Sequence, residues 1–259
     1  ELEWNDIQML DIELALTGTI SKDWYYRLSA DYGTVTSGKN IDSDYFGNDR
    51  TLLFSKSEND AGKGNAFDVN VALGYPLNAG CLGLSVIPIV GYSYQHQHFC
   101  MRNGNQVVDA IHGYVGPIEG LDSSYKTRWS SGVLGLDFLY EPCQNFSVFG
   151  ELAYLFTSYE GRGHWNLRED LLGDFKHEGN GNGVNLAVGT KYEISCGMGL
   201  GLFLDYKFLK VDGGKDRTKF LEPQFDSSGN MVSQTPAVGE LRLNEVKWHS
   251  FRLIGLIDY

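Results

Sequence analysis

The chain has 259 residues, a formal net charge of −12 and an isoelectric point of about 4.9. An acidic chain is a poor partner for nucleic acid, and its surface favours cationic peptides or divalent ions. The composition combines 32 glycines and 15 tyrosines with only 6 prolines, which suits a protein rich in β-sheet. No run of 18 apolar residues is present, so the sequence predicts no transmembrane helix.

Apolar and polar residues alternate along much of the chain, which is the pattern of β-strands. In the first such stretch, 10–17, Leu10 and Ile12 alternate with Asp11 and Glu13. The same period of two returns in eight further ranges, which are 24–33, 67–75, 82–99, 126–140, 145–158, 184–193, 198–208 and 247–259. No helical period competes with it, so we predict nine antiparallel strands in a single all-β domain over 1–259.

The charges and the connections of these strands favour a membrane barrel over a soluble β-sandwich. Charged residues such as Asp31, Asp205 and Lys207 occupy one face of the strands, whereas the other face is nearly free of charge. Short connections near 19–23, 76–81, 140–144 and 194–198 alternate with long polar ones near 34–64, 100–123, 160–183 and 211–245. Short turns at one end and long loops at the other are typical of outer-membrane barrels. We therefore predict a transmembrane antiparallel up-and-down β-barrel of the bacterial outer membrane, with its long loops facing the cell exterior.

Nine is an awkward number of strands, because bacterial single-chain barrels use even numbers. We therefore expect that a tenth strand precedes Glu1 in the full protein. Ten strands enclose a tight lumen that side chains fill. This disfavours a wide porin but allows a narrow channel, in which charges such as Glu13, Arg27 and Lys207 form an interior network of salt bridges.

The four cysteines are Cys81, Cys100, Cys143 and Cys196. Three of them fall at predicted short turns, whereas Cys100 lies at the opposite end of a strand of about 18 residues, which is beyond the reach of a disulfide. We expect at most one intrachain disulfide, among the other three cysteines. No spacing resembles a zinc site.

The stretch KNIDSDYFGND carries Asp42 and Asp44 two positions apart. In extended chain such residues share one face, so the two carboxylates could act together. They could equally be solvated loop residues. A calcium loop is a weaker alternative, because its fifth position is Phe46. His96 and His98 also share a face, and their phase with neighbouring tyrosines favours interfacial polar residues over a metal site.

Seven short motifs, taken in order, resemble the omptins, which are ten-stranded outer-membrane proteases of Gram-negative bacteria. The motifs are ELEW at 1–4, NIDSDY at 40–45, AFDVNV at 66–71, GYSYQ at 91–95, YKTRW at 125–129, GLDFLYE at 135–141 and EGRGHW at 160–165. Together they extend over essentially the whole chain. The resemblance implies a surface endopeptidase that cleaves near basic residues. In omptins an Asp-x-Asp pair and an Asp-x-His pair activate a water molecule across the barrel mouth.

On this resemblance, Asp42 and Asp44 match the acidic pair and His164 matches the histidine. The implied role of the histidine is that of a base, since an imidazole held by a carboxylate can take a proton from water. The position two residues before the histidine is Arg162, where the family has an acid. Glu160 is the nearest carboxylate that could replace that acid.

Two readings of this segment weaken the catalytic assignment. An ungapped alignment shifts the register by two and places Asn166 at the histidine position, which leaves no base. Simple alternation puts Glu160 and His164 on the lipid face. A β-bulge near Gly161 or Gly163 would be needed to turn them inward.

The resemblance also implies a requirement for lipopolysaccharide, with no other cofactor and no metal. Tyr92 and Arg128 match two of the lipid-binding positions, while Tyr94 and His96 stand where a glutamate and an arginine are expected. Arg128 could equally anchor the barrel to lipid phosphate. Because Arg162 departs from the catalytic pattern, the alternative function is a non-catalytic omptin-like barrel. Such a barrel would act as a narrow porin or channel, or as a structural or adhesive surface protein.

Overall fold

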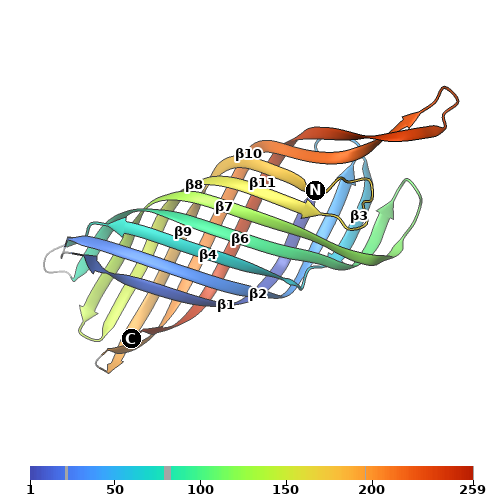
Figure 1. Cartoon of the computed structure of the whole chain (residues 1–259). Coiled ribbons are helices and arrows are strands. Elements are labelled where there is room, and N and C mark those ends of the chain that lie inside the picture. The colour runs from blue at the N-terminus through green and yellow to red at the C-terminus, as the bar shows by residue number, and fades with distance from the viewer. Residues whose placement is uncertain (21–22, 79–82, 196, 259) are drawn as a thin grey trace.

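The structure is a computed structural model, and it describes residues 1–20, 23–78, 83–195 and 197–258. The described residues form an 11-stranded antiparallel sheet that curls into a barrel (Figure 1). The strands are β1 Leu2–Ile20, β2 Trp24–Tyr45, β3 Leu53–Asp60, β4 Gly64–Gly74, β5 Leu77–Asn78, β6 Leu84–Asp109, β7 Gly116–Cys143, β8 Phe146–His164, β9 Phe175–Ser195, β10 Met198–Phe225 and β11 Met231–Asp258. No helix in these ranges is long and apolar enough to cross a membrane.

The nine predicted strands correspond to nine positions in the sheet, whose order is β1-β2-β3-β6-β7-β8-β9-β10-β11. Strand β4 shares the position of β3, because β2 pairs with β4 over 25–34 and with β3 over 39–45. The predicted all-β antiparallel barrel is therefore confirmed. We call the end that contains Tyr45, Asp109 and Phe225 the hairpin end, and the opposite end the turn end.

Alternation sorts the side chains between an inner and an outer wall. On the inner wall Asp31 and Asp205 are buried, whereas on the outer wall Leu10 and Leu14 are 74% and 77% exposed. Exposed outward-facing residues form an apolar band around the barrel, which includes Leu10, Ile12, Leu14, Phe67, Val71, Val90, Tyr92, Leu134, Leu152, Tyr154, Phe156, Leu186, Val188, Leu200, Leu202, Leu204, Phe251 and Leu253. An apolar outer wall around a polar interior is the arrangement of an outer-membrane barrel.

The edges of the sheet, β1 and β11, run in the same direction, because they are connected by eight successive pairings, an even number, that are all antiparallel. The described residues show no ladder between these two strands. The edges nonetheless approach one another, since Arg252 of β11 lies 3.6 Å from Glu13 of β1. A tenth strand stays a prediction.

The long polar connections predicted as loops are largely β-strand, so this part of the prediction was wrong. Strand β2 continues to Tyr45, β6 to Asp109 and β10 to Phe225, and the β10–β11 hairpin extends far beyond the barrel body (Figure 1). Register shifts interrupt the alternation in two of these stretches, near residues 102–104 and 211–214, and a further shift near residues 5–8 lies opposite the continuation of β2. Bulges of this kind reverse the faces of a strand.

Each shift contains a residue with positive φ, which is Asp6 (54°), Asn103 (48°) or Gly213 (84°). These are residue types that tolerate a left-handed backbone.

The interior changes character along the barrel axis. Toward the hairpin end, Phe99 lies between Trp4 and Trp248, with ring centroids 5.1 and 5.7 Å away. Trp129 and Tyr159 pack beside each other in the adjoining apolar core. The middle of the barrel is instead lined by charged side chains, which form the salt-bridge network that the sequence predicts.

Two of the cysteines can be placed. Cys100 and Cys143 are free thiols, and the Sγ of Cys100 lies 4.0 Å from Nε2 of His98. Cys81 and Cys196 lie outside the described residues, so the predicted disulfide stays untested.

Candidate functional site

The predicted acidic pair lies at the hairpin end, on the part of β2 beyond the apolar band. Asp42 and Asp44 pair with Ser57 and Ser55 of β3. Asp42 is half-buried, and its Oδ2 accepts a hydrogen bond of 3.3 Å from Nε1 of Trp165. Burial, together with the neighbouring Asp44 carboxylate, raises the pKa of Asp42 to about 6. This carboxyl group could therefore exchange a proton near neutral pH.

Trp165 belongs to an aromatic cluster that lines the barrel mouth. Its ring packs edge-on against Phe175 at 4.5 Å, and Phe175 contacts His177 at 5.1 Å. Tyr125 also lies against Trp165, with ring centroids 6.4 Å apart. The cluster joins Asp42 to the walls formed by β7 and β9.

A chain of polar contacts runs through the same cluster. Nδ1 of His177 lies 2.6 Å from the Tyr125 hydroxyl, which lies 2.7 Å from the Tyr159 hydroxyl. Nε2 of His177 is 3.6 Å from Oδ1 of Asp216, an ion-pair distance. Burial raises the pKa of both tyrosines well above the usual range. Both hydroxyl groups therefore stay protonated at physiological pH.

Sequence reasoning missed His177 because it ended the strand at Val184. The pairing of β8 with β9 continues without a shift from Tyr192 back to Phe175. Extending the period of two through the glycines at 179, 181 and 183 places His177 on the inner wall, which is the signal that could have found it.

His164 and Glu160 lie on the outer wall of β8. His164 is exposed, and its Nδ1 lies 3.1 Å from Oδ1 of Asp174. Glu160 accepts a hydrogen bond of 2.6 Å from Nε of Arg162. The bulge needed to turn these residues inward is absent, since β7 and β8 pair continuously from 124–164 to 140–148. That assumption was therefore wrong.

The structure thus brings Asp42 into contact with Trp165 and not with His164. His164 and Trp165 follow each other at the end of a strand, so their side chains point to opposite walls. The catalytic roles of Asp42, Asp44, His164 and Glu160 stay predictions. Asn166 occupies the histidine position in the ungapped alignment. Its side-chain oxygen accepts hydrogen bonds from Ser123 Oγ and from the Asp122 backbone N–H, and so holds the segment after β8 against β7.

The predicted lipid-binding residues also lie on the outer wall. Tyr92 and Arg128 are exposed. Arg128 is flanked in register by His96 of β6 and by Glu160 of β8. His98 pairs in register with Lys126 in the next row toward the hairpin end. Within the described ranges, no group of three or more His, Cys, Asp or Glu side chains could hold a metal ion.

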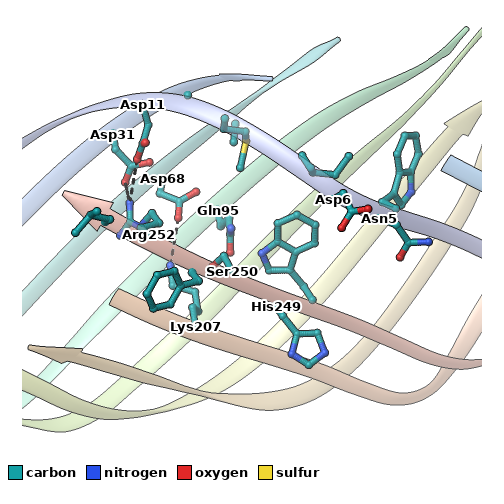
Figure 2. A pocket seen from close by; sticks show the side chains of 18 of the residues that line it. Asn5, Asp6, Asp11, Asp31, Asp68, Gln95, Lys207, His249, Ser250 and Arg252 are labelled. Atoms are coloured by element: carbon teal, nitrogen blue, oxygen red, sulfur yellow. Dashed lines mark hydrogen bonds and ion pairs between the residues drawn. The ribbon is translucent and has the colours of Figure 1, made fainter. Parts of the chain in front are cut away.

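The middle of the inner wall holds a network of buried and half-buried ion pairs, and Figure 2 shows the part around Lys207 and Arg252. Three basic residues, Arg27, Lys207 and Arg252, lie against seven acidic residues, which are Asp11, Glu13, Asp31, Asp68, Asp137, Glu151 and Asp205. Each basic residue links strands that are far apart in the sequence. With all groups ionised, acidic charge exceeds basic charge by four.

A cavity of about 450 Å³ adjoins this network. Its lining extends along β1 from Trp4 to Asp11 and along β11 from Lys247 to Leu253, and includes Asp31 and Asp68. Figure 2 shows the Asp68, Lys207 and Arg252 side chains meeting beside it. The cavity therefore follows the two unpaired edges of the sheet from near the hairpin end to the charged middle of the barrel, with both polar and apolar residues in its lining.

Comparisons with known proteins agree with this architecture. The chain matches the family described as Pom, Protochlamydia outer membrane protein, over residues 1–259. No curated protein matches it. Among solved structures it is similar to the outer membrane protease OmpT from Escherichia coli, with a TM-score of 0.72 and 13% identity, over 100% of this chain and 86% of that chain. At that identity the likeness shows the fold alone. The chain has an omptin-like outer-membrane barrel and belongs to the Protochlamydia outer membrane protein family.

Proposed function

We propose that the protein is a narrow channel for small hydrophilic solutes in the outer membrane, with its hairpin end facing the cell exterior. The observation that supports this most directly is the excess of carboxyl groups over basic groups on the inner wall in the middle of the barrel. A barrel that served only as a scaffold would gain stability from an apolar or fully paired interior.

Buried charge is costly unless it is paired or hydrated. The three basic residues cannot neutralise seven carboxylates, so the remaining carboxyl groups must either hold a proton or be accompanied by water or mobile ions. The adjoining cavity gives such water and ions a place, and its lining reaches toward the hairpin end. In narrow channels, charged side chains that line the pore contact the permeating ions.

The aromatic side chains stacked across the lumen toward the hairpin end limit the size of the solutes. Phe99 is 1% exposed and is held between Trp4 and Trp248. Large solutes could pass only if these rings moved. The proposal is therefore a channel for inorganic ions and very small molecules, rather than a general porin.

Planar-bilayer recording of the refolded barrel tests this proposal. We expect discrete current steps in potassium chloride that persist when polyethylene glycols too large for the lumen are added. Folding is confirmed beforehand by the heat-dependent shift of mobility in gels. Folded protein that produces no steps would overturn the proposal.

A second candidate is the omptin-type endopeptidase that cleaves near basic residues. It is favoured by the two carboxylates at the mouth and by the raised pKa of Asp42. In this case His177, with Asp216 nearby, is a better-placed imidazole than His164. The test is cleavage of a fluorogenic dibasic peptide with lipopolysaccharide added. Loss of activity in Asp42→Ala and His177→Ala, but not in His164→Ala, would support this version.

A measurement of lipopolysaccharide binding to the refolded barrel tests the lipid partner. Arg128 lies between His96 and Glu160 on the outer wall, where a guanidinium group could bind a lipid phosphate. We expect Arg128→Ala to weaken binding of lipopolysaccharide, and Arg217→Ala, on the exposed β10–β11 hairpin, to leave it unchanged.

A further inference from the structure

We propose that three basic residues on the outer wall, Lys126, Arg162 and Lys176, bind acidic groups on the saccharide part of lipopolysaccharide in the outer leaflet. This inference deepens the lipid partner proposed above and rests on the proposed orientation, in which the hairpin end faces the cell exterior. It does not depend on conduction. It follows from a row of like charges in register, from the height of that row above the apolar band, and from the direction in which its side chains point.

The three basic residues form one row across three neighbouring strands. Lys126 of β7 pairs in register with Arg162 of β8, and Arg162 pairs with Lys176 of β9. Side chains directly opposite each other in an antiparallel pair have Cβ atoms about 4.5–5.5 Å apart, and like charges in this position destabilise a sheet. The chain has only 21 lysine and arginine residues against 33 aspartate and glutamate residues. Three basic residues side by side in so acidic a chain therefore favour an anionic partner.

The carboxylates nearest the row leave most of its charge unpaired. Glu160 lies in the adjacent row and accepts a hydrogen bond of 2.6 Å from Nε of Arg162. Glu178, the neighbour of Glu160 on β9, lies opposite a lysine of β10. Lys126 and Lys176 are exposed, and the described part of the chain offers neither of them an acidic partner. An external anion can therefore contact both lysines without displacing a carboxylate.

The row ends at β10. Arg217 lies opposite Lys176 in register, but its Nη2 lies 3.0 Å from Oε2 of Glu240. This guanidinium group is therefore neutralised within the chain, in agreement with the expectation that Arg217→Ala leaves binding of lipopolysaccharide unchanged.

The height of the row determines which lipid groups it can reach. On β8 the last exposed residue of the apolar band is Phe156, and Arg162 follows farther toward the hairpin end. At about 3.3 Å per residue and a strand tilt of about 40°, Arg162 lies roughly 15 Å above Phe156 along the barrel axis. Phospholipid head groups occupy only about 5–7 Å beyond the hydrocarbon core on each side of a bilayer. The row therefore lies above phospholipid head groups, at a level that only a lipid with a longer saccharide head group reaches.

The wall between the apolar band and the charged rows is polar and uncharged. Its exposed and half-buried residues on β7, β8 and β9 are Ser130, Ser158, Asn180 and Asn182. Their hydroxyl and amide groups can donate hydrogen bonds to sugars and accept them. Arg128, the lipid-phosphate position named above, lies one row nearer the band than Lys126. The two positions are therefore suited to successive acidic groups of one glycolipid.

The row faces sideways from the barrel. Pairing of β7 with β8 and of β8 with β9 continues through it without a shift, so its side chains point outward from the wall, toward whatever surrounds the barrel at that height. The β10–β11 hairpin extends far beyond the barrel body (Figure 1), where a soluble partner would meet it first. A lipid head group beside the barrel is therefore favoured over a soluble polyanion.

The experiment measures the apparent Kd of the refolded barrel in detergent for two purified probes, lipid A and a lipopolysaccharide whose inner core carries phosphate. The double variant Lys126→Gln with Lys176→Gln is compared with a matched control, Lys39→Gln with Lys219→Gln, which removes two exposed lysines from β2 and β10. We expect the first variant to bind the core-bearing lipopolysaccharide about three- to tenfold more weakly, since two exposed ion pairs are lost. It should bind lipid A as wild type does. The control should match wild type with both probes.

Folding of each variant is confirmed by the heat-dependent shift of mobility in gels. Equal weakening with both probes, or no weakening with either, would overturn the inference. Weaker binding of heparin, a soluble polyanion, together with unchanged binding of lipopolysaccharide, would overturn it as well. Conductance of the same preparations is recorded separately. A conducting barrel that fails the binding test loses the inference and keeps the channel, whereas a folded barrel that passes it without conducting keeps the inference and loses the channel.

Discussion

The middle of the barrel and its hairpin end follow the same antiparallel pairing, but they differ in how strictly the sequence determines where a side chain points. In the middle, β7, β8 and β9 pair without a shift, and each second residue faces the lumen. At the hairpin end, β1 shifts register against β2 near residues 5–8, and β10 shifts against β9 near 211–214.

The difference has a physical origin in the surroundings of each region. A strand bounded by lipid on one side and a packed lumen on the other cannot slip by one residue, because its apolar face would turn inward. The hairpins extend beyond the apolar band, where the outer face meets water instead of lipid, so a bulge there does not turn a polar face toward lipid. Charged residues in the middle therefore have defined partners, whereas residues at the hairpin end depend on local bulges.

The largest expected effect is the loss of a buried ion pair in the middle of the barrel. Arg27 donates at 2.7 Å to Glu151 and at 3.2 Å to Asp137. The change Arg27→Leu leaves both carboxylates without a counter-charge, which should lower the free energy of unfolding by about 3–5 kcal/mol. Urea unfolding of the detergent-solubilised barrel measures it.

The matched control for that prediction is Arg217→Leu. Arg217 pairs with Glu240 at 3.0 Å on the exposed hairpin, where water and salt screen the interaction. Its unfolding midpoint should stay near that of wild type. Equal losses in the two variants would mean that the middle of the barrel is no more sensitive than the hairpins.

A smaller effect is expected at Gly161, where the two regions meet. A Cβ added there would overlap the Tyr125 hydroxyl and lie 2.6 Å from the Tyr159 hydroxyl. The change Gly161→Ala should separate the two hydroxyl groups and destabilise the barrel by about 1–3 kcal/mol. Gly132→Ala is the control, because no atom lies within 4 Å of the added carbon. Similar unfolding curves for the two variants would contradict the close packing of the tyrosines.

The sequence was sufficient to predict the regular part of this fold and insufficient for its hairpin end. Alternation correctly placed Asp31, Asp205 and Lys207 on the inner wall, because lipid and lumen impose a strict period. It also placed Glu160 and His164 on the outer wall. The single bulge assumed in order to rescue a catalytic site there does not exist.

Contacts between distant strands could not be read from the sequence. The link between Asp42 and Trp165 spans 123 positions, and the identity of Arg252 as the partner of Glu13 depends on how the two edges of the sheet approach. No local pattern specifies either contact. His177 is an intermediate case. Alternation predicts that its side chain faces the lumen once the strand is extended back through the glycines at 179, 181 and 183.

The hairpin end should show a pH dependence that originates at Asp42. Its pKa is raised from an ordinary value of 3.8 to about 6 in the folded barrel. The folded state therefore holds this proton more tightly than the unfolded chain does, and the associated stability is present below pH 4 and lost as the pH rises through 6. In Asp42→Asn this contribution should disappear. The measurement is the difference in unfolding free energy between wild type and Asp42→Asn at several pH values between 4 and 7.5. A difference that does not vary with pH would show that the pKa of Asp42 is ordinary.

The smallest expected effect concerns the indole group that contacts this carboxylate. The hydrogen bond from Trp165 Nε1 favours the ionised form of Asp42 and so lowers its pKa against the effect of burial. The change Trp165→Phe keeps an aromatic ring against Phe175 but removes the donor. The pKa of Asp42 should then rise by a few tenths of a unit, which corresponds to less than about 1 kcal/mol. Comparing Trp165→Phe with the double variant that also carries Asp42→Asn isolates this shift. A midpoint that moves to lower pH would mean that the indole group acts on Asp42 chiefly by excluding water and not as a donor.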